Sequence, residues 1–160
     1  MKEYLPETPE SFDRDKLTEI VERLIDTNRD AEEGYRDAAD HIHDPQLSYY
    51  FSEQSRQRAR FAADLQAELH RIGKWEQTRQ GSVGGTLQRI GFDVKRVLGG
   101  GDQAILQAVE AGEDRGRNAY QEALQARLPF EVIATIRSQA QVVFAAHHHA
   151  RTLRDRRKAA

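Results

Sequence analysis

Apolar side chains recur at alternating spacings of four and three residues near the start of the chain. The positions on this stripe are Leu17, Val21, Leu24, Asn28, Ala31, Tyr35, Ala38 and Ile42, and Asn28 is the polar break in it. Such a spacing places all of them on one face of an α-helix, as in the seam of a helical bundle. Asp13 precedes the stripe and carries a side chain that is suited to an N-cap. The pattern therefore predicts a long helix that starts after Asp13 and buries one face.

A second stripe with the same periodicity follows almost at once. Its members are Leu47, Phe51, Gln54, Arg58, Phe61, Leu65 and Ile72. Between the two stripes stands Asp44-Pro45, in which the aspartate can cap and the proline fits the first helical position. Gly73 marks the expected end of the second helix. Two long helices joined by so short a connection should form an antiparallel hairpin.

Glycine is concentrated between residues 73 and 101, so this stretch reads as a long connection. Within it, apolar residues spaced like one helix face predict a short amphipathic helix over residues 86–98. We expect Asp102 to cap a third helix that ends near Leu128. Pro129 should then force a tight turn into a fourth helix, which ends in a basic tail.

Two hairpins joined by one long crossover define the expected fold class. The chain should be all-α, a four-helix bundle whose second and third helices run parallel because the crossover between them spans the bundle. We assign residues 1–12 to a flexible N-terminal lead-in and residues 13–157 to a single bundle domain.

The composition of the chain argues against several classes of function. The 160 residues suffice for one domain, and a net charge of −2 lacks the basic excess that nucleic-acid binding requires. Cysteine is absent, which excludes disulfides, thiolate metal sites and a cysteine nucleophile. No apolar run approaches a membrane span, and the acidic N-terminus does not resemble a signal peptide. We therefore expect a cytoplasmic protein that binds neither nucleic acid nor membranes.

Polar side chains on or beside the inward stripes fall at one height of the predicted bundle. With a rise of ~1.5 Å per residue, counting along the four helices brings six of them within about one turn of a common layer. These residues are Glu32, Gln54, Arg58, Glu110, Glu113 and His147. Carboxylates are rarely buried without a partner, so the layer predicts either ion pairs or a metal site.

The two interpretations assign different roles to Arg58. In the first, Arg58 donates to Glu113 or Glu32, and the layer fixes the register of the helices without a cofactor or a catalytic residue. In the second, Glu32, Glu110, Glu113 and His147 bind iron or manganese, as in carboxylate-bridged di-metal bundles. The chain has no Glu-x-x-His motif, and a guanidinium competes with metal for carboxylates, which favours the ion-pair interpretation.

Motifs in a fixed order resemble an uncharacterised bacterial family grouped with the ferritin-like proteins. They are Asp30-x-x-x-Gly34-Tyr35-x-x-Ala38-Ala39, Arg58-x-x-Phe61-x-x-x-Leu65, Gly81-Ser82, Gly101-Asp102, Glu110-x-Gly112-Glu113-Asp114, Tyr120, Leu128-Pro129, Gln139 and Ala146-His147. The resemblance spans residues 15–155 and implies a ferritin-like bundle in the cytoplasm. It implies no activity, because the family is one of unknown function.

Two functional hypotheses follow. In the first, the protein is a non-catalytic ferritin-like bundle, associated with stress, that acts through its surface or as a homo-oligomer. In the alternative, it is a metal-binding or redox protein that uses the carboxylate and histidine layer.

Overall fold

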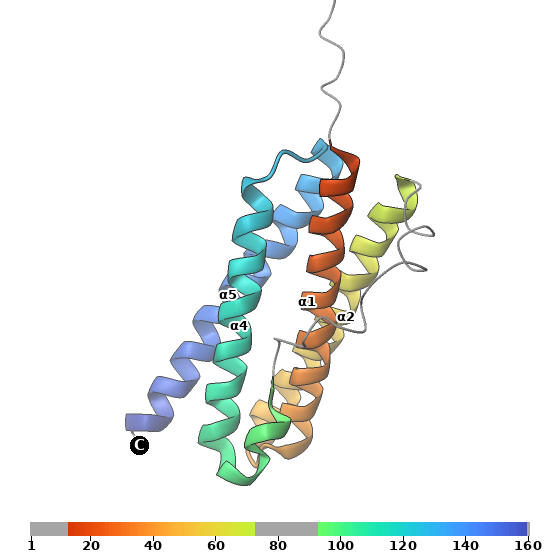
Figure 1. Ribbon diagram of the computed structural model, residues 1–160. Helices are drawn as coiled ribbons and strands as arrows, with labels where there is room; N and C mark the ends of the chain where they lie inside the picture. The colour runs from red at the N-terminus through yellow and green to blue at the C-terminus, as the bar shows by residue number, and fades with distance from the viewer. Residues whose placement is uncertain (1–12, 73–92, 160) are drawn as a thin grey trace, which may run out of the picture.

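The computed structural model describes residues 13–72 and 93–159, and these residues form helices with no strand among them. Four long helices are present: α1 (Arg14–His41), α2 (Pro45–Arg71), α4 (Gly101–Gln125) and α5 (Phe130–Ala159). A short 3-10 helix, η1 (Lys95–Gly100), precedes α4. The prediction of an all-α chain with four long helices is confirmed (Figure 1). The proposed lead-in, residues 1–12, and most of the glycine-rich connection lie outside the described residues.

Side-chain caps start the first two helices where the sequence predicts them. The Asp13 carboxylate accepts hydrogen bonds from the backbone N–H groups of Asp15 and Lys16, at 3.0 and 3.2 Å. The Asp44 carboxylate likewise accepts hydrogen bonds from the backbone N–H groups of Gln46 and Leu47, at 2.9 and 3.3 Å. Pro45 occupies the first position of α2. Each cap satisfies amide groups that have no partner within the helix, so both boundaries are determined locally.

Two boundaries around α4 differ from the prediction. Residues 86–92 of the predicted amphipathic helix lie outside the described part. Near its predicted end, Lys95–Gly100 form a 3-10 helix that closes with glycines, which disfavour a continuous α-helix. Asp102 is not the N-cap of α4: the helix begins at Gly101, and Gly100 occupies the cap position. Gly101 has φ of 79°, a left-handed conformation that favours glycine.

Helices that pack against each other in the bundle run antiparallel. In Figure 1, α1 and α5 run downward, whereas α2 and α4 run upward, so α2 and α4 are parallel as predicted. Within the described part of the chain, α1 packs against α2 and α4, and α5 packs against α4 and α2. The pair α2 and α4 therefore lies on one diagonal of the bundle. The predicted crossover between them falls largely on residues 73–92, which the structure does not describe.

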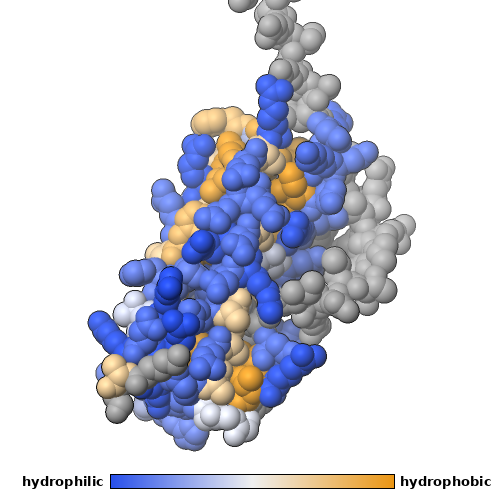
Figure 2. Space-filling view, turned by 60° about the vertical axis from the view of Figure 1, so that its left-hand side comes forward, coloured by the Kyte–Doolittle hydropathy of each residue, from blue (hydrophilic) through white to orange (hydrophobic). Residues whose placement is uncertain are grey.

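Two apolar clusters occupy the interior, one towards each end. The first contains residues such as Leu24, Leu65 and Ile136, and the second contains Phe51 and Leu106. Among the buried polar side chains, Arg58 and Glu113 fall between the two clusters along α2 and α4. On the face shown in Figure 2, hydrophilic side chains cover most of the surface and apolar ones show only as small patches. No described helix combines the length and apolarity that crossing a membrane requires.

Candidate functional site

The centre of the bundle holds an ion pair between α2 and α4, which we call the core pair. Arg58 Nη2 donates to Glu113 Oε1 at 2.7 Å, and the two side chains are 2% and 1% exposed. The hydroxyl of Tyr35, on α1, donates to the same carboxylate oxygen. A long arginine side chain is needed here because the pair spans the bundle diagonal. The predicted contact between Arg58 and Glu113 is therefore present.

Electrostatics keep the groups around the core pair in fixed protonation states. Burial is the largest influence on Arg58 and would lower its pKa, but Glu113, Tyr35 and Tyr120 together outweigh burial and raise the pKa above its usual value. Burial, followed by the charge of Glu113, raises the pKa of Tyr35 well above its usual value. The same two causes raise the pKa of Tyr50 to about 12. Around neutral pH the centre therefore contains a charged guanidinium beside neutral phenols.

A second buried polar chain, the Tyr120 network, lies at the edge of the first apolar cluster. The Tyr120 hydroxyl accepts a hydrogen bond from Asn28 Nδ2 at 2.6 Å and donates one to Gln139 Oε1 at 2.8 Å. Gln139 Nε2 in turn donates to the Phe61 carbonyl at 3.2 Å. Asn28, a polar residue on the first stripe, was one sequence signal for this network, and Tyr120 and Gln139 belong to the motifs of the family resemblance. The Tyr120 network therefore joins all four long helices, α1, α2, α4 and α5.

Glu32 and Gln54 do not contact the core pair, although their positions along the helices predicted that they would lie in the same layer. The Glu32 carboxylate binds Arg36 at 2.6 Å, one turn along α1, and its side chain is 27% exposed. Only its backbone carbonyl faces inward, where it accepts a hydrogen bond from Ser55. Gln54 is half-buried, and its Oε1 has no hydrogen-bond partner among the described residues.

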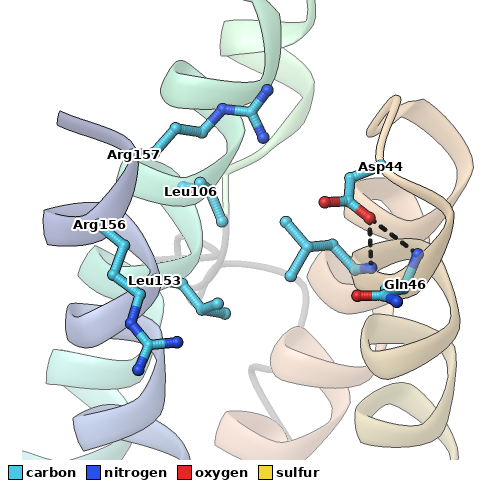
Figure 3. A pocket seen from close by; sticks show the side chains of 7 residues that line it. Asp44, Gln46, Leu106, Leu153, Arg156 and Arg157 are labelled. Atoms are coloured by element: carbon cyan, nitrogen blue, oxygen red, sulfur yellow. Dashed lines mark hydrogen bonds between the residues drawn. The ribbon is translucent and has the colours of Figure 1, made fainter. Parts of the chain in front are cut away.

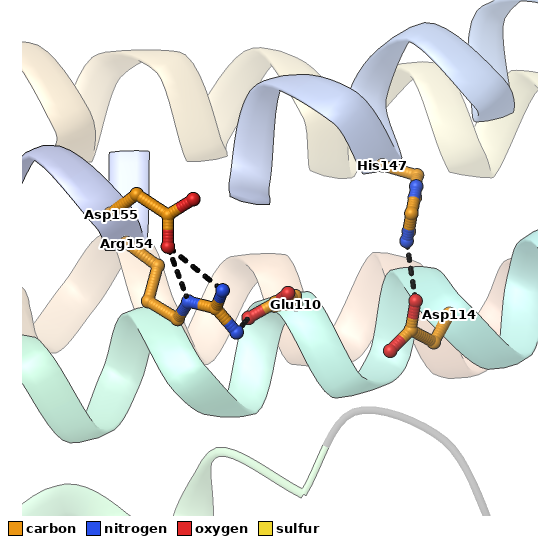
Figure 4. A network of polar contacts seen from close by, with 5 residues as sticks. All are labelled: Glu110, Asp114, His147, Arg154 and Asp155. Atoms are coloured by element: carbon orange, nitrogen blue, oxygen red, sulfur yellow. Dashed lines mark hydrogen bonds and ion pairs between the residues drawn. The ribbon is translucent and has the colours of Figure 1, made fainter. Parts of the chain in front are cut away.

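Glu110 and His147 take part in two separate bridges between α4 and α5 (Figure 4). Arg154 Nη1 donates to Glu110 Oε2 at 2.5 Å, and Arg154 also contacts Asp155. His147 Nε2 contacts the carboxylate of Asp114, at a different point along α4. The four candidate metal ligands thus each have a different partner. Over residues 13–72 and 93–159, no three histidine or carboxylate side chains converge in a way that could hold a metal ion.

Asp102, in the first turn of α4, ties three segments together at the end of the bundle where α4 begins. Its Oδ1 accepts hydrogen bonds from the backbone N–H of His43 at 3.0 Å and from His43 Nδ1 at 2.8 Å. Its Oδ2 lies 3.1 Å from Arg157 Nη2. Burial would raise the pKa of Asp102, but the hydrogen bonds from His43 and the charge of Arg157 outweigh it and lower the pKa. Nothing in the sequence indicated this role of Asp102.

Replacing Asp102 should therefore loosen this end of the bundle. We expect Asp102→Ala to lower the free energy of unfolding by ~1.5–3 kcal/mol, the range for hydrogen bonds to a charged group. Because the folded-state pKa is depressed, the stabilisation is present above the unfolded pKa and is lost as pH falls through the folded pKa. Urea unfolding between pH 7 and pH 3 measures this, and the gap between variant and parent should shrink with acidification.

The matched control is Asp64→Ala, which removes an exposed carboxylate from α2. It should change stability by no more than ~0.5 kcal/mol at any of these pH values. Equal effects of the two substitutions would show that Asp102 contributes nothing specific.

Comparison with known proteins gives one family match. The model of a family described as a domain of unknown function (DUF2383) matches residues 16–126, a range that includes α2, α4 and all of α1 except its first two residues. Both members of the core pair and Asp102 fall inside this range. No curated protein matches the chain.

Proposed function

Because the chain belongs to the DUF2383 family, which is defined without an assigned function, we propose a role from its own side chains. We propose that it is a non-catalytic, ferritin-like four-helix bundle that acts through its surface, as a homo-oligomer in the cytoplasm. In this proposal the cation of Arg58 takes the place that metal ions hold in carboxylate-bridged bundles.

The core pair carries this proposal. Arginine keeps its charge at every accessible pH and cannot bind a metal, so it offsets the Glu113 carboxylate permanently. With its Oε1 engaged by Arg58 and Tyr35, Glu113 has little freedom to turn towards a dication. The remaining candidate ligands point to other partners, since Glu110 binds Arg154 and His147 contacts Asp114.

The alternative function, iron or manganese binding, predicts a different outcome in a direct test. Protein purified without chelator would be analysed for metal, and its unfolding temperature would be measured with and without added Mn²⁺. We expect metal far below one ion per chain and no rise in unfolding temperature, because Arg58 already offsets Glu113. Stoichiometric iron or manganese that is lost in Glu113→Ala would overturn the proposal.

A matched variant distinguishes specific from surface binding of metal. Glu19→Ala removes an exposed carboxylate from α1 and leaves the core pair intact. Metal that is lost equally in Glu19→Ala and Glu113→Ala would belong to the acidic surface of the bundle. Metal that is lost only in Glu113→Ala would instead place the ion in the centre.

A further inference from the structure

A cavity of about 270 Å³ lies between the C-terminal part of α5 and the first turn of α2, with α4 behind it (Figure 3). Three leucines line it, one from each of these helices: Leu47, Leu106 and Leu153. Asp44 and Gln46 stand on the α2 side, and Arg156 and Arg157 project from α5. The cavity therefore combines an apolar floor with a charged rim.

The other charged groups of the rim already have partners. Asp44 Oδ1 accepts hydrogen bonds from the first amide groups of α2, where the helix dipole also favours a negative charge. On the opposite side, Arg157 is paired with Asp102. Arg157 is therefore not available to hold an anionic ligand without breaking its contact with Asp102.

Arg156 is the cation that remains available at the rim. It is exposed, and no carboxylate of the described residues lies within ion-pair distance of it. Its charge also affects a neighbouring group. Burial is the largest cause that lowers the pKa of His149, and the charges of Arg156 and His148 lower it further. The α5 side of the cavity is therefore a region of positive potential beside apolar surface.

We propose that this cavity binds a short straight-chain alkyl carboxylate, with the carboxylate on Arg156 and the alkyl chain against Leu47, Leu106 and Leu153. The guanidinium fork matches a carboxylate in a bidentate geometry. A single available arginine suits a monoanion better than a doubly charged phosphate. The volume is just below the ~300 Å³ at which typical small-molecule pockets begin, so the ligand must be small. This inference does not depend on the function proposed above.

Octanoate is the probe, with the full chain labelled with ¹⁵N and amide chemical shifts followed during titration. We expect saturable shifts centred on the three leucines, with an affinity of roughly millimolar because so small a ligand makes few contacts. Octanamide, which has the same chain without the charge, should bind at least fivefold more weakly. Acetate, which has only the head group, should not shift the leucine amides.

Two substitutions on α5 locate the contact. Arg156→Gln should weaken octanoate binding at least fivefold, whereas Arg151→Gln, another exposed arginine on the same helix, should leave it unchanged. Arg157 is left intact, because its contact with Asp102 would confound the result. The absence of saturation would overturn the proposal. So would equal binding of octanamide, equal leucine shifts with acetate, or equal effects of the two substitutions.

Discussion

Arg58→Met is expected to lower the free energy of unfolding by ~3–5 kcal/mol, the usual cost of removing one partner from a buried ion pair. The reason is that Glu113, which is 1% exposed, would keep its charge in the apolar interior without the guanidinium that offsets it. Methionine approximates the length of the arginine stem, so the loss of packing is small. Urea unfolding at pH 7, followed by circular dichroism, measures the change.

Two further variants separate the charge from the packing. Replacing both partners, as in Arg58→Met with Glu113→Leu, should recover much of the loss, because an apolar pair leaves no unpaired charge. Arg60→Met, at an exposed position on α2, should change stability by no more than ~0.5 kcal/mol. A parent-like unfolding midpoint for Arg58→Met would show that the pair is not buried.

Periodicity along the chain was sufficient to predict the helices and much of the core. Every position of the first stripe, including Asn28, is buried, and all of them except the C-cap residue Ile42 lie in α1. Polar residues on a stripe gave equally useful information: Arg58 lies on the second stripe and is buried as predicted. Spacing succeeds here because burial of a helical face depends mainly on which residues share that face.

The composition of the polar layer was harder to predict, for a geometric reason. Counting residues gives height along a helix, but the direction of a side chain changes by about 100° at each residue. Glu32 has the predicted height, yet it points along the surface of α1 towards Arg36. His147 likewise contacts Asp114, the residue next to Glu113, rather than Glu113 itself. Single-residue differences of this kind determine which pairs form.

The tertiary role of Asp102 was missed because the local sequence fits an N-cap equally well. An aspartate after a run of glycines is a good N-cap candidate, and nothing nearby indicates a tertiary partner. Its actual partners, His43 and Arg157, are about 55–60 residues away on either side and become neighbours only when the bundle has formed.

High pH should unfold the protein through its buried tyrosines, and this is the second large expected effect. Burial is the first cause that raises the pKa of Tyr120 to about 12 and of Tyr35 well above 10. A raised folded-state pKa means that the unfolded chain loses its phenolic protons first, from about pH 10. Stability is therefore complete below pH 10 and decreases as pH rises through the folded-state values.

The expected slope follows from the number of buried phenols. Each contributes up to about 1.4 kcal/mol per pH unit, so Tyr35 and Tyr120 together should remove up to about 3 kcal/mol per unit between pH 10 and 12. Tyr50 contributes less to this slope, because it is only partly buried and solvent screens its interactions with nearby charges. Unfolding by urea at pH 9, 10, 11 and 12, with tyrosinate absorbance recorded in parallel, measures the slope.

Phenylalanine substitutions connect this slope to individual residues. Tyr120→Phe should be less stable than the parent at pH 7, because Asn28 and Gln139 lose a buried hydrogen-bond partner. Its stability should nevertheless fall less steeply above pH 10, because the contribution of one buried tyrosine to the slope is removed. Tyr49→Phe, at a position that is 70% exposed, should keep the slope of the parent. If stability were instead constant between pH 10 and 12, the two buried phenols could not be held neutral in the folded state.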